Sequence, residues 1–156
     1  MLHHQLSKSE RKKFVKRIEY HLRNYNNYKV GILHLKKQLD HILPKTTSTY
    51  EAREESFNNY GRSSSTESVA MERMEGDYAQ QLEQESNEYS LIIEAIDDGM
   101  KVLDEIEYKF VKYRYFNDWS IEKCAMKIGY SDKMLFVIRN QLMDKLLISL
   151  GGIKHI

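Results

Sequence analysis

Apolar side chains recur at helical intervals through residues 15–42. Ile18, Tyr25, Ile32 and Leu39 are spaced seven residues apart. Further apolar side chains flank them at helical spacing: Val15, Leu22, Tyr28, Leu35 and Ile42. Residues three, four and seven apart lie on one face of an α-helix, so the pattern predicts a long amphipathic helical segment.

The ends and the middle of this segment carry signals of their own. Ser7 and Glu10 form a capping box, so we expect the helix to begin at Ser7, and Pro44 stops it after Leu43. Poor helix formers occupy its middle: Asn24, Asn26, Asn27 and Gly31. We therefore expect a break near Asn26, which gives either one bent helix or two collinear helices.

A second long apolar stripe follows a polar linker. Residues 45–65 are rich in Ser, Thr, Asn and charge and have no sustained period, which is typical of a loop. A capping box at Ser64 and Glu67 then opens a helix. Its apolar positions are Tyr78, Leu82, Tyr89, Ile92, Ile96, Met100 and Leu103. Two such stripes can pair as an antiparallel hairpin within one chain or as a coiled coil across a dimer, and both alternatives stay open.

Asp97, Asp98 and Gly99 are expected to loosen this second helix, and they mark a division of the chain. Residues 1–98 then form a long-helix region suited to oligomerisation, with the polar linker at 45–65. Residues 99–156 form a separate helical domain. The expected fold is all-α, with long N-terminal helices followed by a C-terminal three-helix unit.

The C-terminal unit begins with a helix that runs from Asp104 to Phe116. Asp104 and Glu107 form a third capping box at its start. The helix carries a set of apolar and aromatic side chains: Ile106, Phe110, Val111, Tyr113, Tyr115 and Phe116. This set is large enough to form a small core with the helices that follow, and we expect Trp119 to close that core.

From Ser120 to Ile138 the spacing is that of a helix-turn-helix. Ala125 is small where two helices must approach closely, Gly129 supplies the positive φ of a sharp turn, and Ser131 caps the second helix. The shared apolar seam comprises Cys124, Ile128, Leu135 and Ile138. The function most often built on this geometry is insertion of the second helix into the major groove of DNA.

The second helix of this unit supplies the candidate DNA-binding residues. They are Ser131, Lys133, Phe136, Val137, Arg139, Asn140 and Gln141. Lys133 and Asn140 can form hydrogen bonds with base edges, whereas Asp132 would repel phosphates. Phe136 and Val137 suit either thymine methyl groups or an apolar groove on a protein, so both kinds of partner stay open.

The net charge of +1 conceals an uneven distribution along the chain. Residues 1–45 carry 11 Lys and Arg against 3 Asp and Glu, residues 46–98 carry 3 against 13, and residues 99–156 carry 10 against 7. An acidic middle between two basic ends indicates that the ends either bind a polyanion or fold back onto the middle, although solvated helix faces would look the same.

Several function classes find no support in the sequence. No apolar run reaches the roughly 20 residues of a membrane span, and residues 1–13 lack the apolar core of a signal peptide, so we expect a cytoplasmic protein. The single cysteine excludes an intramolecular disulfide. The six histidines are scattered without metal-ligand spacing. We expect no enzyme, no metal and no cofactor.

Two groups of motifs carry a resemblance to known proteins. Residues 112–131, followed by Ile138 and Lys145-Leu146, resemble region 4 of a bacterial sigma factor, with an aromatic and basic helix, a Ser-capped helix, a glycine turn and a recognition helix. Upstream features are similar to phage-encoded transcriptional regulators of the RinA/ArpU type. These features are the basic opening with Leu22 and Tyr25, the Leu43-Pro44 stop, the Ser/Thr linker and the Thr66-Glu67-x-x-Ala70 motif.

The resemblance implies a phage or prophage gene in a Gram-positive host whose product activates late or packaging genes. The expected function is that of a sequence-specific regulator that binds double-stranded DNA, contacts RNA polymerase and forms a homo-oligomer. One alternative is a small terminase-type packaging protein, which would assemble into rings and be recognised by its molar mass in solution. Another is an adaptor that presents Phe136 and Val137 to RNA polymerase and has no DNA affinity.

Overall fold

The structure is a computed structural model that describes residues 7–42 and 64–150, with the side chains of residues 64–69 left out. All regular structure in these residues is helical, which confirms the all-α prediction. The helices are α1 (Lys8–Arg23), α2 (Tyr25–Ile42), α3 (Ser64–Lys101), α4 (Glu105–Val111), α5 (Ile121–Ile128) and α6 (Asp132–Leu150). A π-helical turn, η2 (Lys112–Phe116), continues α4.

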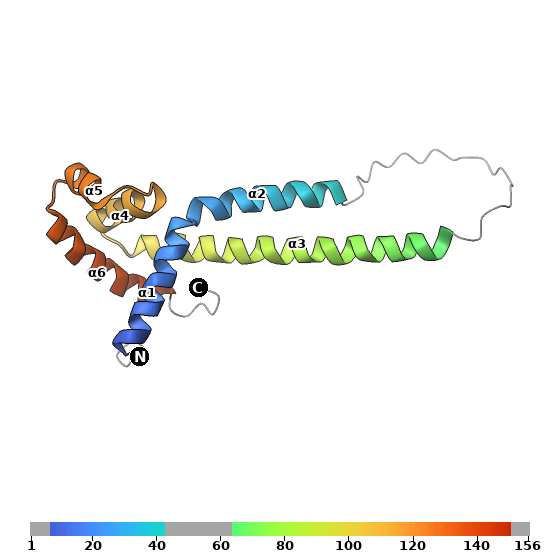
Figure 1. The fold of residues 1–156 in the computed structure, drawn as a ribbon, viewed down its shortest axis with the longest axis horizontal. Coiled ribbons are helices and arrows are strands. Elements are labelled where there is room, and N and C mark those ends of the chain that lie inside the picture. Colours follow the sequence, from blue (N-terminus) through green and yellow to red (C-terminus); the bar gives the residue numbers. More distant parts are fainter. Residues whose placement is uncertain (1–6, 43–63, 151–156) are drawn as a thin grey trace.

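The predicted N-terminal cap and the predicted break near Asn26 are both present, but the two helices are not collinear (Figure 1). Ser7 Oγ accepts the Glu10 N–H at 3.2 Å and the Glu10 carboxylate accepts the Ser7 N–H at 2.9 Å, which confirms the capping box. α1 ends at Asn24, whose side-chain amide and backbone N–H both donate to the Tyr20 carbonyl. α2 then leaves at a steep angle (Figure 1). The prediction of two collinear helices is therefore wrong.

α2 and α3 lie side by side in opposite directions, so the two apolar stripes pair within one chain (Figure 1). Gly31 allows the close approach, because a Cβ there would lie 3.0 Å from Cε2 of Tyr89. At 1.5 Å per residue, α3 is about 57 Å long and α2 about 27 Å, so α3 runs beyond the end of α2. Tyr78 lies near that end and is 48% exposed, so its prediction as a stripe residue is wrong.

The predicted loosening at residues 97–99 does not occur, because α3 continues to Lys101. Gly99 is instead buried where α3 meets α6, and a Cβ there would lie 3.1 Å from Cδ2 of Leu146. The glycine permits a close helix crossing. One apolar core spans the predicted division after residue 98, which itself stays a prediction. The predicted end at Leu43 and Pro44, the Ser64 capping box and most of the 45–65 linker lie outside the described residues and side chains.

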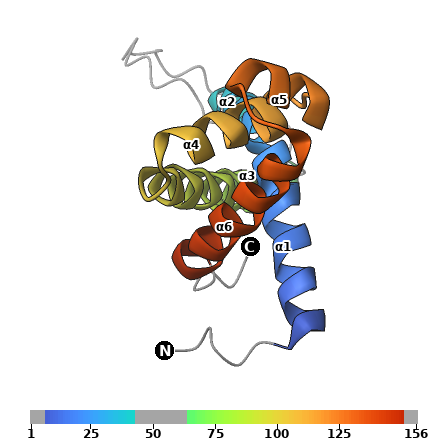
Figure 2. The same ribbon diagram turned by 90° about the vertical axis from the view of Figure 1, so that its left-hand side faces the viewer.

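The main core is assembled around α6 from both ends of the chain. Its largest fully buried side chains are Ile18, Leu22, Ile96, Phe110, Val111, Tyr115, Leu135, Leu142, Met143, Leu146 and Leu150. They come from α1, α3, α4, η2 and α6, joined by the smaller Cys124 of α5, so α1 packs on the C-terminal helices although it is far from them in sequence (Figure 2). No helix in the described ranges is both long and apolar enough to span a bilayer.

Candidate nucleic-acid interface

α5 and α6 are joined by a three-residue turn whose geometry follows from its sequence. Gly129 ends α5 at φ +85°, in the left-handed region that favours glycine, as predicted. Its N–H donates to the Ala125 carbonyl at 2.8 Å, and the Tyr130 N–H donates to the same oxygen at 3.2 Å. Ser131 Oγ then accepts the Met134 N–H at 3.3 Å and caps α6. The turn fixes how α6 leaves α5.

The predicted seam between these helices is largely confirmed. Cys124, Leu135 and Ile138 are buried, together with the small Ala125, and Ile128 is partly buried. Since Leu135 and Ile138 lie on one face of α6, the opposite face of its first turns points away from the core. The seam therefore decides which side chains of α6 can meet a partner.

Cys124 offers a direct test of this seam because it is the only cysteine of the chain and has no exposed surface. Burial raises the pKa of its thiol, so the reactive thiolate is scarce at neutral pH. We expect a thiol reagent to label the native protein only as fast as the seam opens, and an unfolded sample in denaturant at once. Fast labelling of native protein, measured as released chromophore, would contradict the packing of α5 on α6.

Most predicted binding residues lie together on the outward face of α6. Lys133, Asn140 and Gln141 are exposed, while Phe136 and Val137 are 52% and 46% exposed. Lys133, Phe136 and Asn140 follow one another at spacings of three and four residues, so they form one stripe over two turns. Ser131 is exposed at the start of this stripe but its hydroxyl already serves as the cap.

Arg139 does not join this stripe. Its Nε and Nη2 donate to the Glu19 carboxylate of α1 at 2.9 and 2.6 Å. Tyr115 of η2 donates its hydroxyl to the same oxygen of Glu19 at 2.8 Å, and burial together with that carboxylate raises the pKa of Tyr115, so the hydroxyl stays protonated. Arg139 thus fastens α1 to α6. The structure places it apart from the other predicted DNA-binding residues.

Trp119 packs against the core of the C-terminal helices, as predicted. It is partly buried, packs against the core and stacks on Tyr113 with ring centroids 4.8 Å apart. The ammonium of Lys123 lies 4.1 Å from the centre of its ring, and Arg114 donates to its carbonyl oxygen. These contacts hold the start of α5 against η2.

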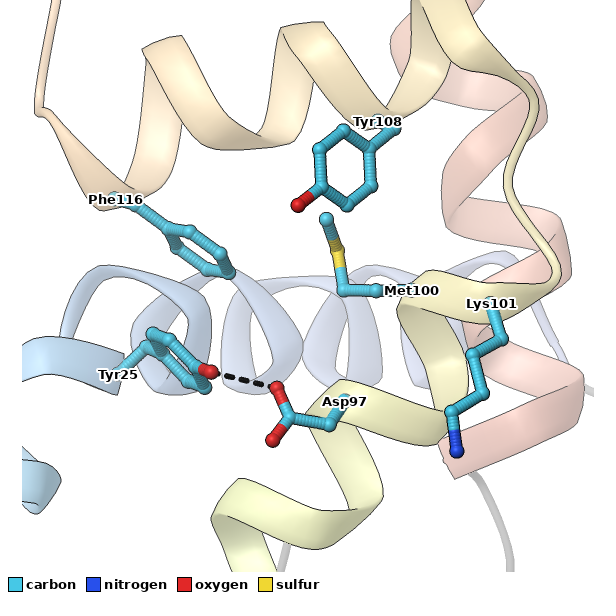
Figure 3. A pocket seen from close by; sticks show the side chains of 6 residues that line it. All are labelled: Tyr25, Asp97, Met100, Lys101, Tyr108 and Phe116. Carbon is cyan, nitrogen blue, oxygen red and sulfur yellow. Dashed lines mark hydrogen bonds between the residues drawn. The ribbon is translucent and has the colours of Figure 1, made fainter.

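A small hollow lies where α2, α3, α4 and η2 meet (Figure 3). It has a cavity volume of about 230 Å³ and is lined by Tyr25, Asp97, Met100, Lys101, Tyr108 and Phe116. Its two central polar groups satisfy each other, since the Tyr25 hydroxyl donates to Asp97 at 2.6 Å, and the Tyr25 ring stacks on Phe116. Ligand sites usually exceed about 300 Å³ and hold convergent free polar groups. The hollow is therefore a junction between helices and not a ligand-binding site.

Elsewhere in residues 7–42 and 70–150, titratable side chains do not gather into a reactive site. In the part of the chain that the structure describes, no group of three His, Cys, Asp or Glu side chains could hold a metal ion. Glu107 is a nearly fully buried carboxylate, which accepts the Asp104 N–H at 2.9 Å and pairs with Lys145 at 2.6 Å. It caps α4 and ties that helix to α6.

The basic N-terminal helix makes its ion pairs with the C-terminal helices. Arg11 pairs with Asp144 at 2.6 Å, and Arg23 pairs with Asp118 at 3.0 Å. Across residues 7–42 and 64–150, no ion pair joins α1 or α2 to the acidic α3. The ion pairs of α1 therefore tie it to the C-terminal part of the chain, whereas α2 meets α3 through apolar contacts and the Tyr25–Asp97 hydrogen bond.

Comparison with protein families, with curated proteins and with solved structures finds no match to this chain. The function must accordingly be argued from the surface of α6 and from the sequence motifs that it carries.

Proposed function

We propose that this protein is a sequence-specific DNA-binding transcription regulator in which α5 and α6 form a helix-turn-helix. In this proposal the first turns of α6 enter the major groove. The observation that carries it is the coincidence of a left-handed glycine turn, a buried seam and an outward stripe with Lys133 and Asn140 on the same helix. A recognition helix needs all three features, because one face must be packed on the rest of the unit while the opposite face stays exposed to DNA.

The side chains of the stripe match the chemistry of base edges. Lys133 donates to acceptors such as guanine O6 and N7, and Asn140 can both donate to and accept from adenine. Phe136 is apolar and exposed beside them, which suits contact with a thymine methyl group. Asp132, in the first turn of α6, repels a phosphate placed at that point.

The biological role follows from the resemblance to sigma region 4 and to RinA/ArpU-type phage regulators. We assign the protein a place at phage late or packaging promoters in a bacterial host cell, where it activates transcription. Its partners would be double-stranded DNA, RNA polymerase and a second copy of itself. Each of these assignments depends on the motifs of residues 112–146 and of the N-terminal half.

The test is selection of bound duplexes from a random pool, followed by titration of the enriched sequence by fluorescence anisotropy. We expect a common motif and binding that is at least about a thousandfold tighter than to random duplex at physiological salt. If no motif is enriched and all duplexes bind equally weakly, sequence-specific recognition is excluded. If no duplex binds at all, the regulator proposal fails as a whole.

One observation favours a second candidate function. Phe136 and Val137 are adjacent and about half exposed, so they form a small apolar patch that suits contact with a protein partner. In this alternative the chain is an adaptor that presents α6 to RNA polymerase. It predicts that Phe136 matters for activation and that the polar residues of the stripe do not matter for DNA affinity.

A further inference from the structure

α1 carries a concentration of positive charge that its ion pairs do not account for. Its 16 residues include seven Lys and Arg against two Glu. Arg11 and Arg23 pair with Asp144 and Asp118, as described above. Within the described ranges, Lys8, Lys12 and Lys16 are exposed and form no ion pair. They follow one another at intervals of four residues, so they form a ridge about 12 Å long.

The orientation of this ridge follows from two residues on the same face of α1. Lys12, Lys16, Glu19 and Arg23 are spaced four, three and four residues apart, which places them on one side of the helix. Glu19 reaches Arg139 and Arg23 reaches Asp118, just before α5. Arg11, which lies between Lys8 and Lys12 along the chain, reaches Asp144 in the second half of α6. From its C-terminal end, α1 thus passes Asp118, Arg139 and then Asp144, so the lysine ridge lies beside the second half of α6, beyond Asn140.

The N-terminal half of α1, which carries the ridge, extends beyond α6. Figure 2 shows α1 crossing α6 and continuing past it, with the N-terminal end of α1 extending away from the body of the molecule. Arg11 on this extending half reaches Asp144, which is exposed on the outward side of α6. A duplex whose groove receives α6 would thus meet the lysine ridge at its flank.

We propose that Lys8, Lys12 and Lys16 bind the phosphate backbone of duplex DNA beside the groove that α6 enters. This inference rests on the proposed function and adds a second contact element to it. Lysines contact phosphates without regard to sequence, so α1 would set the register and affinity of the complex while α6 reads the bases. The Arg139–Glu19 pair then has a role in DNA binding, because it holds the ridge at a fixed position relative to α6.

α1 has no free apolar face that could insert into a lipid surface. A helix that lies in a membrane interface needs a free apolar face beneath its basic face. The apolar face of α1, with Val15, Ile18 and Leu22, is buried in the protein core. Duplex DNA needs only the exposed lysines, and its dense linear charge complements an extended basic ridge.

The experiment compares two double variants with equal loss of charge. Lys12→Ala/Lys16→Ala removes the ridge, and the control Lys13→Ala/Arg17→Ala removes two exposed cations from the outward side of the same helix. Affinity for the selected duplex and for a random duplex is titrated against salt. For the ridge variant we expect a log-log salt slope that is shallower by about two and similar losses on both duplexes. The control should change the slope by less than half as much.

Several outcomes would overturn the inference. Equal slope changes for the two variants would show that only the total charge of α1 matters, and an unchanged slope for the ridge variant would show that it touches no phosphate. Tighter binding of single-stranded RNA, or of vesicles with anionic phospholipid, than of duplex would assign the ridge to another polyanion. If wild-type protein binds no duplex, the proposed function itself fails.

Melting temperatures of both variants should match the wild type, since these side chains lie outside the core. A fall in melting temperature confined to the ridge variant would also count against the inference.

Discussion

Gly129→Val is expected to abolish sequence-specific DNA binding and to lower the melting temperature in the same variant. Gly129 has φ +85°, and a Cβ built on it would meet no atom within 4 Å. The cost is therefore backbone strain rather than a clash, about 1–3 kcal/mol, and it is largest for a β-branched side chain. At roughly 2–4 °C per kcal/mol the loss is measurable by thermal unfolding. Because α6 leaves α5 through this turn, relief of the strain would redirect α6.

Two control variants separate strain from volume at this position. Gly129→Asn should retain most binding, since asparagine tolerates the left-handed region, and Gly129→Ala should fall between Asn and Val. Circular dichroism should show that all three stay helical. A Gly129→Val protein with normal melting and normal affinity would remove Gly129 as the residue that sets the α5–α6 geometry.

Local signals in the sequence predicted the elements that local physics determines. The capping box at Ser7, the left-handed glycine at Gly129 and the burial of Cys124 with Leu135 all follow from residues within a few positions of one another. Each depends on backbone hydrogen bonds or on helical spacing, which a single sequence displays directly. These features could be predicted without any knowledge of the rest of the chain, and the structure confirms them.

The sequence misled where a distant helix decides the outcome. Gly99 is a poor helix former, yet α3 continues through it because α6 packs against the bare backbone there. Propensity predicted the break near Asn26 correctly, but not the steep turn there, which lets α1 pack on α6 while α2 packs on α3. At Gly99 tertiary packing outweighs a propensity of about 1 kcal/mol per residue, and at the break it sets the angle between the helices.

The candidate site also combines features that the local sequence predicts with features that distant contacts decide. Exposure of Lys133 and Asn140 follows from the seam on the same helix and was predictable. The fate of Arg139 was not, because its partner Glu19 lies 120 positions away in the chain. The lysine ridge of α1 was visible in the sequence only as net charge, and its place beside the second half of α6 follows from the contacts of Arg11, Glu19 and Arg23.

Alanine substitutions in the outward stripe of α6 are expected to weaken DNA binding, each by its own amount. Lys133→Ala and Asn140→Ala should each cost about 1–3 kcal/mol of binding to the selected duplex, which corresponds to roughly a 5- to 160-fold change, with a smaller effect on random duplex. Both side chains are exposed, so folding should be unchanged. The matched controls Lys36→Ala and Asn87→Ala lie on α2 and α3, away from the stripe, and should bind like the wild type.

Phe136→Ala distinguishes a DNA-reading helix from a protein-binding one. Its ring is 52% exposed, so truncation should not unfold α6. If the ring meets a thymine methyl group, the variant should bind the selected duplex more weakly, and the loss should shrink when that thymine is replaced by uracil, which lacks the methyl group. Gel-shift titration gives the affinity and a promoter reporter in the host gives activation. Full affinity of the Lys133, Asn140 and Phe136 variants, combined with loss of activation for Phe136→Ala, would assign this face of α6 to a protein partner and overturn the DNA-reading proposal.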